Sequence, residues 1–132
     1  MPTGEMLHKD VTKRVLGEFF QVHYELGVGY LESIYSAAMA CALIGAGLNV
    51  DREVPIAVHF RGTRIGSFRA DLIVESCVLV EVKCGAQLHP HAEAQLLNYL
   101  RSTELEVGLL LHFGEKPSFK RLVYSNERKL LR

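Results

Sequence analysis

The sequence predicts one α/β domain in which a mixed sheet is flanked by helices. Three observations predict it: two helical patterns at the start, alternating strand patterns in the middle, and a helix followed by an apolar strand near the end. The 132 residues are 48% hydrophobic and 23% charged, which fits a single folded domain over residues 1–132. No stretch is apolar enough to cross a bilayer and the N-terminus lacks the layout of a secretory signal, so we expect a cytoplasmic protein.

The first helical pattern extends from Val11 to Tyr24, where apolar residues recur at near-helical spacing. We expect this helix to end at Gly27, because glycine readily adopts the backbone conformation that terminates a helix. A second pattern opens after Gly29, continues to Leu43 and ends near Gly45. The first third of the chain therefore predicts two helices.

The middle of the chain alternates at a period of two residues. Apolar residues occupy every second position from Val54 to Phe60, and the sequence RGT at residues 61–63 supplies a turn before the pattern resumes. We expect one strand over residues 68–74 and the next over residues 77–83, joined tightly by residues 75–76. These segments predict a three-stranded antiparallel meander.

The last third predicts a helix and two more strands. His89 and Pro90 introduce the helix, because proline is favoured in a first helical turn. Residues 107–113 form a continuous apolar run suited to a strand covered on both faces, and residues 119–124 predict an edge strand. The predicted order is therefore α-α-β-β-β-α-β-β.

Charge and cysteine content argue against three classes of protein: those that coat nucleic acid by charge alone, those built on disulfides and those built on a structural zinc site. The net charge is zero, which argues against a protein that coats nucleic acid by charge alone. Residues 116–132 nevertheless hold six basic residues against Glu127, and they form either a phosphate-facing flank or a solvated tail. Three cysteines without a C-x-x-C pair favour reduced, mostly buried thiols, and they predict neither a disulfide framework nor a zinc site.

The most informative residues are Asp71, Glu81 and Lys83, on two consecutive predicted strands. Alternate strand residues share a face, so Glu81 and Lys83 project together while Val82 points into the core. Two converging carboxylates repel, and a hard cation such as Mg²⁺ or Mn²⁺ between them would remove that repulsion. The alternative is a surface ion pair of Glu81 with Lys83, but the apolar strand around them looks central, which favours a site.

These residues resemble a known family. An aspartate followed by a Glu-x-Lys triplet on consecutive strands, within this order of elements, is similar to the PD-(D/E)XK nuclease superfamily with its restriction-endonuclease-like core. Residues 29–35 read GYLESIY and match the signature of the GxxExxY family of small bacterial and archaeal proteins. The resemblance covers roughly residues 11–124, with three separate motifs in the right order.

The resemblance implies a role for each matching residue. Asp71 and Glu81 correspond to carboxylates that bind Mg²⁺ or Mn²⁺, Lys83 to the catalytic lysine, and Glu32 to a helix-borne acid that joins the metal site in many members. Ala70 replaces the proline of the name motif, which many members lack. The implied substrate is nucleic acid of unspecified type.

A further motif lies on the third predicted helix. Gln95 and Tyr99 resemble the Q-x-x-x-Y motif of RecB-type nucleases, whose helix flanks the catalytic strands and helps to orient the substrate or the lysine. They are also i,i+4 neighbours that could simply hydrogen-bond at a packed interface. Glu32, three residues after Gly29, has a comparable alternative as a helix-capping acid at position N3.

The histidines carry less information. His89 and His91 are two imidazoles without a third ligand at helical or strand spacing, which favours a helix-start loop over a metal site. His112 is most simply a histidine at the end of an apolar strand.

The function that the sequence predicts is metal-dependent hydrolysis of phosphodiester bonds in nucleic acid. The alternative is a catalytically silent protein of the nuclease fold that acts as a binding or scaffold module. The small size is compatible with a homodimer, whose interface the sequence does not specify.

Overall fold

The computed structural model describes residues 7–129, with residues 1–6 and 130–132 outside the description. The predicted order of helices and strands is confirmed, and a short 3₁₀ turn follows the last strand. The elements are α1 (Lys9–Leu26), α2 (Glu32–Gly45), β1 (Val50–Phe60), β2 (Thr63–Val74), β3 (Val78–Cys84), α3 (Ala92–Arg101), β4 (Val107–Phe113), β5 (Pro117–Val123) and η1 (Asn126–Arg128).

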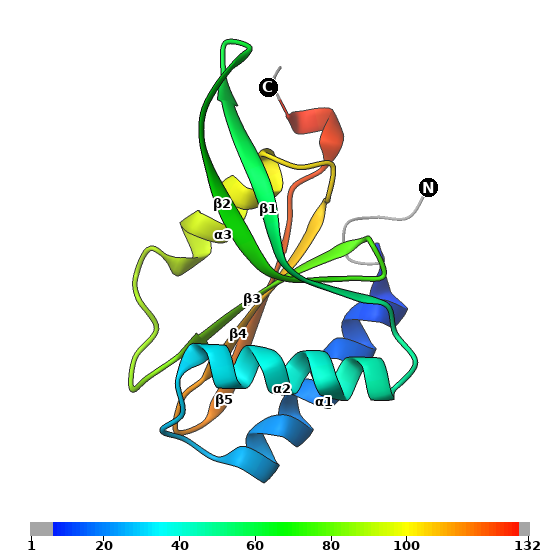
Figure 1. The fold of residues 1–132 in the computed structure, drawn as a ribbon, viewed down its shortest axis with the longest axis vertical. Helices are drawn as coiled ribbons and strands as arrows, with labels where there is room; N and C mark the ends of the chain where they lie inside the picture. The colour runs from blue at the N-terminus through cyan, green and yellow to red at the C-terminus, as the bar shows by residue number, and fades with distance from the viewer. Residues whose placement is uncertain (1–6, 130–132) are drawn as a thin grey trace.

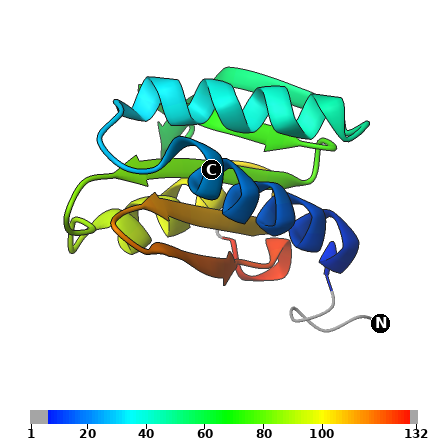
Figure 2. The ribbon, with the colours of Figure 1, turned by 90° about the horizontal axis from the view of Figure 1, so that it is seen from below.

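The five strands form one mixed sheet in the order β1-β2-β3-β4-β5 (Figure 1). Neighbouring strands are antiparallel except for β3 and β4, which are parallel and are connected through α3. Helices α1 and α2 cover one face of the sheet and α3 covers the other (Figures 1 and 2). We call these the α1/α2 face and the α3 face.

The core on the α1/α2 face is large and apolar. In β3 and β4 alternate residues point to this face, as the period of two requires. The fully buried side chains of Phe19, Tyr35 and Phe113 meet at its centre, where the rings of Tyr35 and Phe113 stack with centroids 4.3 Å apart. The strand residues that contribute to this core are Leu72, Val74, Val78, Val80, Val82, Val107, Leu109, Leu111 and Phe113.

The core on the α3 face is smaller. Leu96 and Leu100 of α3 pack against Leu79 and Leu110 of the sheet. Gly108 allows this close approach, because a Cβ atom there would lie 2.9 Å from Cδ1 of Leu96. All seven residues of β4 are buried, which confirms the prediction of a strand covered on both faces.

The β2–β3 turn differs by one residue from the prediction. Glu75 and Ser76 have φ values of 52° and 54°, and the Cys77 N–H donates to the Val74 carbonyl oxygen at 3.0 Å. Val74 pairs with Val78, so Cys77 belongs to the turn and not to β3 as predicted. This extra residue sets the register in which β2 faces β3.

Other expectations from the sequence have mixed outcomes. No helix within residues 7–129 is both long and apolar enough to cross a membrane. The expectation of mostly buried cysteines is wrong: Cys41 is exposed, Cys77 is half-buried in the β2–β3 turn, and Cys84 is half-buried at the end of β3. The homodimer stays a prediction.

Candidate active site

The site lies where β2 and β3 separate. Their ladder contains the pairs Leu72–Val80, Ile73–Leu79 and Val74–Val78, and it stops there. The next pair in this register would place Asp71 opposite Glu81, yet the strands no longer pair at that point. The two carboxylates therefore occupy the opening between neighbouring strands of the sheet.

Asp71 itself bridges this opening. Its Oδ2 atom accepts a hydrogen bond of 2.7 Å from the backbone N–H of Val82. The β2 backbone no longer reaches the Val82 N–H, and the Asp71 side chain accepts this hydrogen bond in its place. A buried backbone N–H needs such a partner. The contact fixes the Asp71 carboxylate beside β3, because the donor residue, Val82, directly follows Glu81.

Glu81 is the most unusual polar group in the site. Its side chain is only 4% exposed, and its Oε1 atom is buried without a hydrogen-bond partner among the described residues. Burial raises the pKa of Glu81 to about 9, and the neighbouring charge of Asp71 contributes to the increase. A buried carboxylate oxygen without a partner is costly, so this atom is suited to accept a cation or a hydrogen-bond donor.

Lys83 projects toward α3, on the same side of β3 as Glu81. Its Nζ atom donates to Oε1 of Gln95 at 3.2 Å. This hydrogen bond joins the Glu-x-Lys triplet to the Q-x-x-x-Y helix. Gln95 is exposed, which argues against the alternative that it only fills a packed interface.

Tyr99 lies one helical turn after Gln95 and closes the other side of the site. Its ring stacks on Phe68 of β2, with centroids 3.5 Å apart and planes inclined by 10°. Burial raises the pKa of Tyr99, and the nearby charges of Glu81 and Asp71 raise it further. The hydroxyl therefore stays protonated and available as a donor near both carboxylates. Phe68 was not predicted, because an apolar residue on a strand carries no signal of such a role.

Glu32 is placed differently from the other predicted residues. It is the first residue of α2, with Leu31 as the N-cap, so the sequence-based placement at N3 is wrong by two positions. It is exposed, and its charge adds to burial in raising the pKa of the Cys84 thiol. Within residues 7–129 no three His, Cys, Asp or Glu residues are grouped to hold a metal ion. Glu32 as a third ligand stays a prediction.

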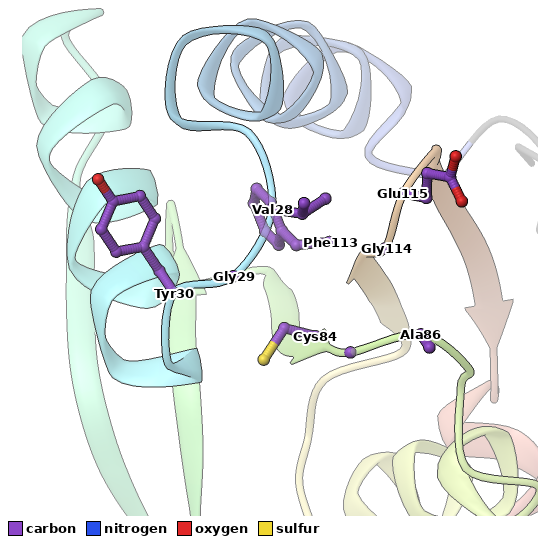
Figure 3. Close-up of a pocket in the computed structure, with 9 residues that line it drawn as sticks. Val28, Gly29, Tyr30, Cys84, Ala86, Phe113, Gly114 and Glu115 are labelled. Carbon is purple, nitrogen blue, oxygen red and sulfur yellow. The ribbon is translucent and has the colours of Figure 1, made fainter.

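A hollow of about 650 Å³ lies at the carboxyl ends of β3 and β4. Figure 3 shows its wall, which three segments form: residues 28–30 before α2, residues 84–86 at the end of β3 and residues 113–115 at the end of β4. Two of these segments follow the carboxyl ends of the parallel strands, the usual place for ligands in α/β proteins. The sequence did not predict this hollow, because it lies between segments far apart in the chain.

The histidines have structural contacts. Nε2 of His112 lies 3.0 Å from the Gly85 carbonyl oxygen and must carry a proton to bond it, which ties the loop after β3 to β4. His89 and His91 are exposed in the segment before α3, with Nδ1 of His89 accepting from the His91 N–H. This agrees with the interpretation as a helix-start loop.

A model of the PD-(D/E)XK nuclease superfamily matches residues 9–122. The chain belongs to this superfamily. The crystal structure of SSO0001 has the same fold, with a TM-score of 0.58 and 19% identity over 89% of this chain. This chain covers 60% of the SSO0001 chain. No curated protein matches the sequence.

Divalent metals are general in this superfamily, and the residues present fit such an ion. Two carboxylates converge, one with a buried oxygen that lacks a partner, and both provide the hard oxygen ligands that Mg²⁺ and Mn²⁺ prefer. A cation beside them would offset the mutual repulsion that raises the pKa of Glu81. The donor set thus suits a small divalent ion.

Proposed function

We propose that this protein is a metal-dependent nuclease of the GxxExxY group, which hydrolyses phosphodiester bonds in nucleic acid. The observation that carries the proposal is Glu81: a buried carboxylate with an unpartnered oxygen, beside Asp71, on a strand that also carries Lys83. An apolar residue would suit this position better in a protein that only needed the fold. Membership of the superfamily supports the same assignment, and so does the GxxExxY signature at residues 29–35.

Each residue has a separate task in this proposal. Asp71 and Glu81 hold Mg²⁺ or Mn²⁺, an ion that supplies Lewis acidity and charge stabilisation to phosphodiester cleavage when it is bound. Lys83 directs its ammonium group toward the attacking water and the developing phosphate charge. Gln95 positions Lys83 through the 3.2 Å hydrogen bond, and the Tyr99 hydroxyl donates to the substrate or the carboxylates.

Cleavage assays on single-stranded, duplex and branched DNA and RNA test the proposal. With Mg²⁺ or Mn²⁺ the wild-type protein should cleave at least one of these substrates, and EDTA should stop it. Lys83→Ala should lower the rate at least about 100-fold while substrate affinity changes little, because the lysine acts on the reaction and not on binding.

Lys13→Ala is the matched control, since Lys13 is an exposed lysine of α1 with no role in the proposal. It should cleave like the wild-type protein. If the wild-type protein and Lys83→Ala are equally inactive on every substrate, the nuclease assignment fails. The scaffold alternative then stands.

A further inference from the structure

The β1–β2 hairpin continues well beyond the rest of the sheet. The β2–β3 ladder ends at Leu72, so the residues of β2 from Thr63 to Ala70 pair with β1 alone, except Ile65, which is unpaired. Figure 1 shows the two strands extending to the top of the molecule as a separate ribbon. We call residues 54–70 the arm; its base is anchored on α3 by the Phe68–Tyr99 stack, and its outer part is free.

The arm carries positive charge without any negative charge. Its 17 residues include Arg61, Arg64 and Arg69 together with His59, and no Asp or Glu. All three arginines are exposed, and none forms an ion pair with another described residue. The rest of the chain has an excess of acidic residues, because the whole sequence is neutral. The arm is therefore a local basic surface.

Register places two of the arginines on one face. The pairs Ile56–Phe68 and Val54–Ala70 point toward α3, so the intervening pair Pro55–Arg69 points away from it. The irregularity after Val58 leaves Ile65 unpaired and brings Arg64 opposite His59, on the same outward face as Arg69. The two arginines are then about 13 Å apart along the ribbon. This spacing suits an extended polyanion better than a single phosphate.

The tip of the arm adds an apolar element. Phe60 and Ile65 are 56% and 64% exposed, and the guanidinium of Arg61 lies 4.9 Å from the centre of the Phe60 ring. Arginine and exposed apolar side chains on a narrow ribbon are features of strands that enter a DNA groove. A two-stranded ribbon fits the B-form major groove, whereas the A-form groove of duplex RNA is too narrow.

The C-terminal basic residues contrast with the arm. The Lys129 ammonium donates to the carbonyl oxygens of Thr103 and Leu105, Arg121 donates to the Leu7 carbonyl oxygen, and Lys120 pairs with Glu93 at 3.6 Å. Residues 117–123 form β5, so this segment is not the solvated tail that the sequence also allowed, and Arg132 lies outside the described residues. Several of its cations stabilise the fold, whereas those of the arm face solvent.

We propose that the arm binds the sugar-phosphate backbone of duplex DNA. Asp71 directly follows the arm, so the arm and one of the two carboxylates belong to the same strand, β2. The inference rests on the proposed function and names its substrate class. It adds a surface that neither the catalytic triplet nor the Q-x-x-x-Y helix provides.

The test measures binding and not cleavage. Fluorescence anisotropy with a labelled DNA duplex in EDTA compares the wild-type protein with Arg61→Gln/Arg64→Gln/Arg69→Gln over a range of KCl concentrations. The triple variant should bind roughly tenfold or more weakly at about 100 mM KCl. The slope of log Kd against log[KCl] should fall by about 2.7 if all three arginines contact phosphates.

Lys9→Gln/Lys13→Gln is the control, because it removes two exposed charges of α1, outside the arm. It should retain near wild-type affinity. Arg64→Gln alone, an exposed substitution, keeps the test valid if the triple variant does not fold. Equal affinities and equal salt slopes for the arm and control variants overturn the inference. It is also overturned if the arm variant loses affinity only for single-stranded nucleic acid or only for an acidic protein.

The outcomes separate the two proposals. A protein that binds the duplex through its arm and never cleaves in Mg²⁺ or Mn²⁺ contradicts the proposed function and supports the arm. If the wild-type protein cleaves DNA and the triple arm variant binds and cleaves DNA equally well, the proposed role of the arm is contradicted and the proposed function stands.

Discussion

The two faces of the sheet differ in how completely they are apolar. On the α1/α2 face β3 presents Val78, Val80 and Val82, all fully buried. On the α3 face the same strand presents Leu79, then Glu81, then Lys83, so the apolar core ends halfway along the strand. One strand therefore stabilises the fold with one set of residues and forms the candidate active site with the other.

The apolar face should be the more sensitive to truncation. Leu72→Ala removes a fully buried side chain from the core on the α1/α2 face and should lower the free energy of unfolding by about 2–5 kcal/mol. Urea denaturation measures this loss. Ile65→Ala, at a 64% exposed position, should change the value by less than about 0.5 kcal/mol. Equal losses would mean that the α1/α2 core does not dominate stability.

The pH dependence of stability should originate on the α3 face. Because the pKa of Glu81 is raised to about 9 from 4.5, its contribution to stability is complete below about pH 4.5 and is lost as pH rises through 9. The free energy of unfolding of the metal-free protein should fall over this interval, by at most about 1.4 kcal/mol per pH unit.

Glu81→Gln should remove most of this dependence, since glutamine stays neutral at every pH. Urea denaturation in EDTA at several pH values measures it. Glu127→Gln, a substitution at an exposed position outside the site, is the control. Parallel curves for the wild-type protein and Glu81→Gln would show that Glu81 is charged when folded.

Gln95→Ala should have the smallest effect. Loss of its hydrogen bond to Lys83 should reduce cleavage by about tenfold, because one charge-assisted hydrogen bond is worth about 1.5 kcal/mol, and should leave metal-dependent stabilisation intact. Steady-state cleavage and thermal melting measure the two effects. Asn98→Ala, another exposed residue of α3, is the control. Unfolding of Gln95→Ala would instead favour a packing role.

The order of elements was predictable because hydrophobic periodicity and turn residues are local signals. The register of β2 against β3 was not. A two-residue turn would place Asp71 opposite Val80, on the face away from Glu81, because a slip of one residue exchanges the two faces of a strand. Cys77 in the turn prevents this, and nothing local to Cys77 in the sequence indicates it.

The candidate site was predictable in part. Asp71, Glu81, Lys83, Gln95 and Tyr99 were named from motifs, and the structure brings them to one face. The distance of Glu32 from the carboxylate pair depends on how α2 packs, which its own sequence does not encode. The basic arm has a local sequence signal that matches no motif: its 17 residues include three arginines and no acidic residue.

The central claim is that Asp71 and Glu81 together hold a divalent cation. Its most direct test is thermal melting of the wild-type protein, Asp71→Asn and Asp51→Asn in EDTA and in increasing millimolar Mn²⁺. Asp51 is an exposed aspartate of β1 and serves as the control. The melting temperature of the wild-type protein and of Asp51→Asn should rise with Mn²⁺ by mass action, and that of Asp71→Asn should not. A wild-type melting temperature that stays constant, or an equal rise in Asp71→Asn, would contradict the account.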